Sequence, residues 1–346
     1  MKIATEDFAR LAASAAKVAN DKHANPVAKF VRLEASGGKL RATATDFDYW
    51  LERSAPCDGD LPVLLVAAKQ LDEVAKALKA DTLDVTADAT HLHIKAGKSK
   101  RKLAIQPADA FPTLPEVDGE GVSVERAALM TALEFCQPYV DAGRGQVFGG
   151  VHISNGNSYA TDGKAMARYA HGLDMPGVTL TTAFIKALSD NLPDGEIAIV
   201  VGERRIEASW AEGSVAGPLV EGQYPDVERI IPRDASTTIA VDCDALSRAV
   251  AGVKALSGGR NLIALDVGDS VTLTGRATDG EATDELDATR DGNPLSIGFN
   301  AMYLERVGKG FAKHGLRIEM NGDTAAAKIT SLDDDRKLVV VMPMRI

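Results

Sequence analysis

Three copies of one sequence pattern run through this 346-residue chain, and they limit its fold more than any other feature. Three short segments end a strand pattern in the same way, and their aspartates lie about 116 residues apart. The segments are TATDFD, YATDGK and RATDGE, and the aspartates are Asp46, Asp162 and Asp279. Each copy opens on a short strand followed by an amphipathic helix: IATEDFARLAASAAKV, VSVERAALMTALEFC and IAVDCDALSRAVAGV. A pattern repeated at this period predicts three similar domains.

A second strand and helix follow within each copy, and alternating apolar and polar stretches come after them. The second units are VLLVAAKQLDEVAKAL, VTLTTAFIKALSDNL and LSIGFNAMYLERVGKGF. Alternation with a period of two is typical of half-buried strands. The sequence therefore predicts an α+β fold in which helices cover one face of antiparallel sheet. We expect the three domains to span residues 1–119, 120–235 and 236–346.

Composition limits the class of protein. A formal charge of −10 argues against indiscriminate binding to nucleic acid or anionic lipid, although net charge does not say where the charges lie. The three cysteines are far apart and form no C-x-x-C pair, which favours reduced thiols. The first residues, MKIATEDFAR, lack the apolar region of a signal peptide, and no apolar run is long enough to span a membrane. We expect a cytoplasmic protein.

The sequence gives little support for catalysis. The three aspartates occur once per copy at equivalent places, so the repeat separates them in space, and turn formation explains them better. His91 and His93 alternate on a predicted strand and share a face, but nothing nearby completes a set of metal ligands. No nucleotide-binding or metalloprotease motif is present. We expect a protein that is not an enzyme and has no metal or cofactor.

Several segments, in order and at matching spacing, resemble the bacterial β sliding clamp family, of which this chain looks like a divergent member. They are MKI at the start, ATDGKAMA, EGQYPDVERIIP, IGFNAMYLERV and VVMPMRI. The resemblance implies three topologically similar DNA-clamp domains and a homodimer joined head to tail into a ring. Antiparallel sheets would face outward, and helices would line the hole through which duplex DNA passes. The implied function is that of a processivity factor of DNA polymerase III.

The resemblance also implies that positive charge is needed on the inner helices, where it would contact phosphates without reading sequence. The basic residues on these helices are Arg10, Lys17, Lys69, Lys76, Lys79, Lys186, Arg248, Lys254, Arg306, Lys309 and Lys313. Lys22 falls where the family often has a basic residue on a loop of the first domain. One departure concerns Thr181, Thr182 and Ala183, which stand where relatives commonly have a basic pair.

A second implied site is a groove that receives short hydrophobic peptide motifs. Its partners in the family are the replicative polymerase alpha subunit, the clamp loader delta subunit and other proteins with a clamp-binding motif. The matching positions are Phe148, Thr161, Gly163, Lys164, Ala165, Met166, Pro225, Arg229, Ile230, Tyr303, Val340, Met342, Pro343, Met344, Arg345 and Ile346. The terminal KLVVVMPMRI would thus be core strand first and ligand surface after it. Methionine suits such a surface because its flexible side chain fits several ligands.

The subunit contact is implied at Leu103 and Leu256, while Arg101 replaces a usual aromatic residue. Together with the missing basic pair, Arg101 keeps an alternative open: a non-replicative protein-binding scaffold that has the clamp fold. Lys164, Ala165 and Met166 also replace a usual histidine-arginine-leucine triplet, so the peptide preference of the groove is not fixed by the sequence.

Overall fold

The computed structural model describes residues 1–119, 121–143 and 146–346. Within these residues one order of elements occurs three times: strand, helix, four strands, helix and three strands, with one additional strand, β21, in the third copy. The repeated strand-helix pattern is therefore confirmed. The α-helices of the described chain are α1 (Thr5–Val18), α2 (Ala68–Lys76), α3 (Arg126–Cys136), α4 (Thr182–Asn191), α5 (Cys243–Lys254) and α6 (Ala301–Gly310).

Five short 3-10 helices occur in the described connections. They are η1 (Pro26–Lys29), η2 (Ala108–Ala110), η3 (Gln137–Tyr139), η4 (Gln146–Phe148) and η5 (Val227–Ile230). None of the described helices is long and apolar enough to cross a membrane.

The chain forms two compact units, each from two separate stretches: residues 1–127 with 181–219, and residues 128–180 with 220–346. A sheet of twelve antiparallel strands builds the first unit, in the order β1-β6-β7-β8-β5-β2-β3-β4-β16-β15-β14-β9. Its strands are β1 (Lys2–Ala4), β2 (Phe30–Ser36), β3 (Lys39–Thr45), β4 (Trp50–Pro56), β5 (Leu61–Ala67), β6 (Thr82–Ala87), β7 (His91–Ala96), β8 (Ser99–Gln106), β9 (Gly121–Glu125), β14 (Glu196–Val201), β15 (Arg205–Trp210) and β16 (Gly213–Pro218).

The second unit contains two sheets. Nine strands run in the order β13-β10-β11-β12-β25-β24-β23-β17-β21, and four run in the order β20-β19-β18-β22. The strands are β10 (Gly150–Ser154), β11 (Asn157–Thr161), β12 (Ala165–Ala170), β13 (Val178–Thr181), β17 (Thr237–Asp242), β18 (Leu262–Val267), β19 (Val271–Ala277), β20 (Gly280–Leu286), β21 (Ala288–Gly292), β22 (Leu295–Asn300), β23 (Gly315–Met320), β24 (Ala327–Ser331) and β25 (Lys337–Val341).

Strand pairing divides the middle repeat between the two units. β16 pairs with β4 of the first repeat, and β12 pairs with β25 of the third. At the first junction Gly213 lies opposite Arg53, and a Cβ on Gly213 would come within 2.1 Å of the Glu52 carbonyl oxygen. A side chain at this position is therefore excluded by the close approach of the strands. The middle repeat is joined to both neighbours by main-chain hydrogen bonds.

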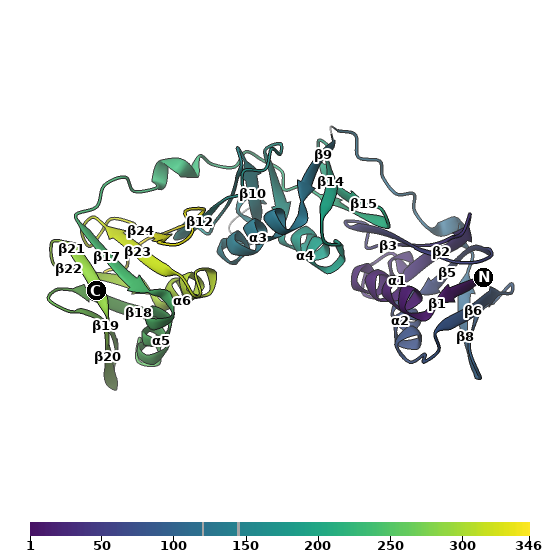
Figure 1. Ribbon diagram of the computed structural model, residues 1–346, viewed down its shortest axis with the longest axis horizontal. Coiled ribbons are helices and arrows are strands. Elements are labelled where there is room, and N and C mark those ends of the chain that lie inside the picture. Colours follow the sequence, from purple (N-terminus) through teal and green to yellow (C-terminus); the bar gives the residue numbers. More distant parts are fainter. Residues whose placement is uncertain (120, 144–145) are drawn as a thin grey trace. The chain divides into compact units, whose positions relative to one another are not determined.

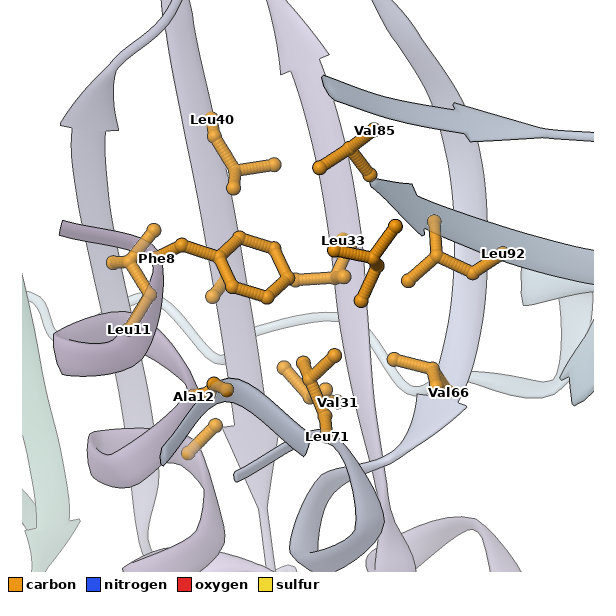
Figure 2. Packing of buried hydrophobic residues seen from close by; sticks show 14 of the residues in the cluster. Phe8, Leu11, Ala12, Val31, Leu33, Leu40, Val66, Leu71, Val85 and Leu92 are labelled. Atoms are coloured by element: carbon orange, nitrogen blue, oxygen red, sulfur yellow. The ribbon is translucent and has the colours of Figure 1, made fainter. Parts of the chain in front are cut away.

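Helices pair on one face of their sheet, as α1 and α2 do in the first unit and α5 and α6 in the second (Figure 1). Helix α1 buries Phe8, Leu11 and Ala12 at its usual three- and four-residue spacing, and they pack on the strand residues Val31 and Leu33 (Figure 2). Burying a side chain as large as those of Phe8 and Leu11 contributes about 1.5–3 kcal/mol. The opposite faces of the helices carry the polar and basic residues, because the apolar stripe faces the sheet.

Candidate functional site

The C-terminal run is core strand up to Val341 and exposed tip beyond it. β25 lies between β12 and β24, and Leu338 to Val341 are buried. After the strand, the Met342 N–H donates to the Lys164 carbonyl at 2.8 Å, and the Met344 N–H donates to the Gly298 carbonyl at 2.8 Å. The side chains of Met342 and Ile346 nevertheless remain 47% and 60% exposed. The tip is therefore anchored through its backbone and presents apolar side chains to solvent.

Close backbone approach fixes the end of this tip. A Cβ on Gly298 would lie 2.5 Å from the Met344 carbonyl oxygen and 3.1 Å from the Ile346 side chain, so only glycine fits there. The guanidinium of Arg260 also donates to the Arg345 carbonyl at 3.4 Å. Neither Gly298 nor Arg260 was expected from the sequence, because their contacts are with backbone atoms far along the chain.

The turn after β11 lies beside the tip and is organised by Asp162. Its Oδ1 accepts the N–H groups of Lys164 and Ala165, both at 2.9 Å, and Gly163 has a φ of +79°. Its Oδ2 accepts from the Tyr303 hydroxyl at 2.9 Å and from the Arg306 guanidinium at 3.1 Å. The Asp162 carboxylate thus connects this turn to helix α6.

Burial and hydrogen bonding have opposite effects on the pKa of the Asp162 carboxyl. Burial raises the pKa of its carboxyl, whereas the bonds from the backbone and from Tyr303 and Arg306 lower it, and the net pKa lies below the usual value. Burial, together with the bond to Asp162, raises the pKa of Tyr303 to about 12. At neutral pH the charged Asp162 carboxylate therefore faces the neutral phenol of Tyr303.

Beneath the tip, part of the predicted groove is interior. Thr161, Ala165, Met166 and Val340 are all buried, and Met166 lies opposite Val340 in the β12–β25 ladder. Met166 and Val340 belong to one hydrophobic cluster with Tyr159, Tyr224 and Val227. These groove residues therefore support the surface from below.

The exposed residues of the predicted groove lie in three segments: η5, the turn after β11 and the C-terminal tip. Pro225, Arg229 and Ile230 lie on or beside η5, whose Val227 is buried while Ile230 is 53% exposed. Gly163, Lys164 and Arg345 are exposed, and Phe148, Tyr303, Pro343 and Met344 are half-buried. One ring contact joins Phe148 to the segment before η5: Phe148 packs edge-on against Tyr224 at 6.3 Å, and Tyr224 precedes Pro225.

A small pocket lies next to η5 that the sequence did not indicate. His152, Tyr159, Tyr224, Pro225 and Glu228 are among its lining residues. The imidazole of His152 stacks on the Tyr224 ring at 4.5 Å, and burial lowers the pKa of His152. The Tyr159 hydroxyl donates to Glu228 at 2.8 Å. Pro225 belongs to the predicted groove, whereas sequence reasoning missed His152, Tyr159 and Tyr224, because such ring side chains are usually core.

The twelve basic residues predicted to face DNA lie on helices or the loops beside them. Ten are exposed, and Lys254 and Arg306 are half-buried. Seven form ion pairs with carboxylates of the chain: Arg10–Asp7, Lys17–Asp190, Lys69–Asp21, Lys76–Asp72, Lys186–Asp190, Lys254–Glu305 and Arg306–Asp162. Within the described residues, Lys22, Lys79, Arg248, Lys309 and Lys313 have no ion pair.

Lys17 of α1 and Lys186 of α4 bind the same carboxylate, Asp190, at 2.9 Å each. Arg306 lies over the rings of Tyr139 and Tyr303 while it bonds to Asp162, so its guanidinium is engaged within the fold. Its assignment to the DNA-facing set remains a prediction.

Comparison with known proteins gives a consistent result along the chain. Residues 1–115 match the family model for the DNA polymerase III beta subunit, N-terminal domain, and residues 228–345 match that for its C-terminal domain. A beta sliding clamp of Pseudomonas aeruginosa is 28% identical over 344 residues, covering 93% of each chain. The chain belongs to the β sliding clamp family. At this level of identity it is a divergent member.

Solved clamps have the same fold as this family member. The crystal structure of a Pseudomonas aeruginosa DnaN sliding clamp bound to griselimycin matches it with a TM-score of 0.94 and 26% identity, over 100% of this chain and 99% of that one. The beta subunit of Streptococcus pyogenes DNA polymerase also reaches 0.94, at 19% identity and with 100% and 99% coverage, which supports the fold alone. The α+β clamp fold predicted from the sequence is thus confirmed.

Where this clamp departs from the expected family pattern at Thr181, the structure gives a physical reason. Thr181 caps helix α4: its hydroxyl accepts the N–H of Phe184 at 3.1 Å and lies 2.6 Å from the Tyr49 hydroxyl. A lysine or arginine could not make this cap. The position supports helix α4 instead of carrying a positive charge.

The turn aspartates of this clamp fulfil the structural role expected of them in two copies. Asp46 accepts the N–H groups of Asp48 and Tyr49, as Asp162 accepts those of its own turn.

His91 and His93 share a face, with rings 6.3 Å apart, and His93 bonds to Asp88 at 2.7 Å. Among the described residues no group of three or more His, Cys, Asp or Glu side chains is arranged to hold a metal ion.

The two predicted interface leucines both lie beside strand edges in this clamp. Leu103 is half-buried on β8, and Leu256 is half-buried where α5 ends. The Leu256 side chain contacts the site of Gly280 on β20, since a Cβ there would lie 3.3 Å from it. Their role in a subunit contact remains a prediction.

Proposed function

We propose that this protein is a processivity factor of DNA polymerase III: two copies form a ring that encircles duplex DNA and tethers the polymerase. The observation that carries this proposal is the match to sliding clamps along the whole chain, with coverage of 100% and a TM-score of 0.94. A clamp acts by topology, so we also infer that the protein catalyses no reaction. The domain limits 1–119, 120–235 and 236–346 belong to the same proposal.

Contact with DNA is proposed for the exposed basic faces of the helices. Lysine and arginine on these faces would meet phosphates in any sequence, as sliding requires. The internal ion pairs of residues such as Lys17 and Lys186 favour weak contacts, because each phosphate must compete with a carboxylate already in place. Weak and sequence-independent contacts suit a ring that has to move along the duplex.

Partner binding is proposed for the surface around the C-terminal tip. Met342 and Ile346 expose apolar side chains on the tip, and Ile230 exposes one on η5. Lys164, whose carbonyl accepts the Met342 N–H, is exposed and supplies a charge beside the tip. A short hydrophobic peptide suits this surface, since flexible methionines adapt to different side chains. We assign to it the replicative polymerase alpha subunit, the clamp loader delta subunit and other proteins with a clamp-binding motif.

The proposal is tested by topology. The mass of the purified protein in solution is expected to be twice 36.5 kDa by light scattering. After loading by a clamp loader, the protein should be retained on circular DNA and lost when the circle is cut. A stable monomer that is never retained on circles contradicts the ring and favours the scaffold that has the clamp fold.

A further inference from the structure

The turn after β3 in the first repeat has the same internal hydrogen bonds as the turn after β11 in the middle repeat. Oδ1 of Asp46 accepts two backbone N–H groups of its own turn, at 3.1 and 2.8 Å, as Oδ1 of Asp162 does, at 2.9 Å each. The threonine before each aspartate, Thr45 or Thr161, donates its hydroxyl to the carbonyl four residues further along, at 2.8 and 2.7 Å. The two carboxylates are therefore held in equivalent positions by equivalent turns.

The second oxygen of the Asp162 carboxylate binds a guanidinium within the fold. Oδ2 of Asp162 accepts from the Tyr303 hydroxyl at 2.9 Å and from the Arg306 guanidinium at 3.1 Å. These two donors are the third and sixth residues of helix α6. At the junction of the middle and third repeats, the helix of the following repeat thus supplies the cation that this turn binds.

The corresponding helix at the first junction lacks both donors. The third and sixth residues of α4 are Phe184 and Ala187, and neither side chain can donate a hydrogen bond. Oδ2 of Asp46 accepts no hydrogen bond from a described residue, and its carboxylate forms no ion pair with one. The first turn therefore presents the same carboxylate without the cation.

A cavity of about 180 Å³ lies at this place, between the turn and helices α1 and α4. Asp46 and Tyr49 line it from the turn, and Ala183 and Ala187 line it from α4. A water molecule takes up about 30 Å³ in the liquid, so the cavity has room for a group of several heavy atoms. The small alanine side chains leave this room on the side where α6 carries Arg306 in its own junction.

A second hydrogen-bond acceptor without a partner lies in the wall of the cavity. Asn191 lines the cavity and is only 4% exposed. Its Nδ2 donates to the Ala187 carbonyl at 2.9 Å, whereas its Oδ1 has no hydrogen-bond partner among the described residues. A buried oxygen of this kind costs free energy unless a donor reaches it. Together with Oδ2 of Asp46, it favours a ligand that has more than one N–H donor.

The lysines at the cavity do not neutralise Asp46. Lys17 and Lys186 also line it, but both ammonium groups bind the Asp190 carboxylate at 2.9 Å. One carboxylate of the lining therefore binds two cations, and the other binds none among the described residues. A guanidinium suits the second better than an ammonium does, because it is planar, carries five N–H donors and is more weakly hydrated.

We propose that this cavity is a binding site for a guanidinium group carried on an alkyl chain, with Oδ2 of Asp46 and Oδ1 of Asn191 as its acceptors. The bound group takes the position that the Arg306 guanidinium has in the equivalent junction. The site depends neither on the proposed ring nor on the proposed peptide surface. Its ligand is either a small molecule or an arginine side chain of another protein, since both offer the same chemistry.

The test follows butylguanidinium binding to the full-length chain by NMR, with ¹³C in the alanine methyl groups and ionic strength held constant. The methyl signals of Ala183 and Ala187 should shift and saturate with a dissociation constant on the order of 1 mM, as expected for a ligand of this size. Butylurea has a similar shape and no charge. It should bind at least about tenfold more weakly, because hydrogen bonds between charged groups are the stronger ones.

Two variants test the residues of the site. Asp46→Asn keeps an oxygen for the turn and removes the charge, so it should weaken butylguanidinium binding at least about tenfold. Ala187→Arg puts a guanidinium at the position in α4 that is equivalent to Arg306. This variant should be at least as stable as the wild type in thermal melting, and the Ala183 signal should no longer respond to the ligand.

Asp48→Asn is the matched control, since it makes the same change of charge at an exposed residue of the same turn. It should bind butylguanidinium within about twofold of the wild type, because exposed charges contribute little. N-acetylarginine amide, which carries the same head group on a peptide backbone, distinguishes the two sources. Affinity within about tenfold of that of butylguanidinium assigns the site to an arginine of another protein, and weaker binding assigns it to a small molecule.

Three results would overturn the inference. The first is the absence of any saturable shift of the Ala183 and Ala187 signals in the wild type. The second is equal binding of butylurea and butylguanidinium, which would show that the Asp46 charge has no part in recognition. The third is binding by the folded Ala187→Arg variant that matches the wild type, which would place the ligand outside this cavity.

Discussion

The hydroxyl of Tyr303 donates to the Oδ2 of Asp162 at 2.9 Å, which joins helix α6 to the turn after β11. The same oxygen accepts the guanidinium of Arg306 at 3.1 Å. Because Lys164 in that turn also accepts the Met342 N–H, the position of the C-terminal tip depends on this contact. One carboxylate therefore determines how three segments of the proposed peptide site lie together.

Replacing Asp162 should destabilise the fold. We expect Asp162→Asn to lower the free energy of unfolding by about 2–3 kcal/mol, because hydrogen bonds to a charged group contribute more than neutral ones and the new amide N–H₂ would face two donors. Urea unfolding measures the change. The equivalent Asp279→Asn in the third repeat is the control, since Asp279 is exposed. Equal effects of the two substitutions would contradict the role given to Asp162.

The lowered pKa of Asp162 predicts that the stability of the fold depends on pH in the acid range. The folded-state pKa of Asp162 is lowered, so its charge stabilises the fold fully above the unfolded-state pKa of about 3.9, and this contribution disappears as pH falls through the folded-state pKa. The difference in unfolding free energy between wild type and Asp162→Asn should therefore be constant near neutral pH and shrink below about pH 4. Unfolding curves of both proteins across this range test it. A difference that does not change with pH would show that the charge is not involved.

Removing Met342 to Ile346 should abolish peptide binding and leave a folded protein. β25 ends at Val341, so the deletion removes exposed side chains and two backbone contacts without shortening the sheet. Titration with a labelled peptide carrying a clamp-binding motif measures the affinity, and light scattering checks the dimer. Ile346→Ala is the milder variant, which should weaken binding without changing the melting temperature. If the deletion bound as tightly as the wild type, the peptide site would lie elsewhere.

Freeing the two lysines at Asp190 should strengthen contact with DNA. Asp190→Asn removes the carboxylate that Lys17 and Lys186 share. Each lysine that then reaches a phosphate should steepen the slope of log affinity against log salt by about 0.9. Binding to short duplexes at several salt concentrations measures that slope. Asp174→Asn, an exposed site with the same change of charge, is expected to leave the slope unaltered.

The repeat made much of the fold predictable. Equal spacing of the aspartate turns and the strand-helix openings gave the order of elements, because each element depends on local periodicity. The boundary between β25 and the exposed tip could also be predicted, since the apolar run continues past Pro343. Both features lie within short windows of sequence.

Long-range pairing was not predictable in the same way. Nothing in the middle repeat indicates that β16 pairs with β4 while β12 pairs with β25, because strand pairing is decided by residues far apart in the chain. The Lys17–Asp190 ion pair joins residues 173 positions apart, and the sequence did not predict it for the same reason. The family resemblance predicts that Met166 and Val340 belong to the groove, but only the structure shows that both side chains are buried.

The division of the middle repeat has a consequence during synthesis. The first compact unit needs residues 181–219 to complete its sheet, so β4 must wait for β16 while about 160 intervening residues emerge from the ribosome. During that interval β4 can pair with β3, but its other edge is open to association with strands of other nascent chains. The N-terminal half of the protein therefore reaches its final form only after most of the middle repeat has been translated.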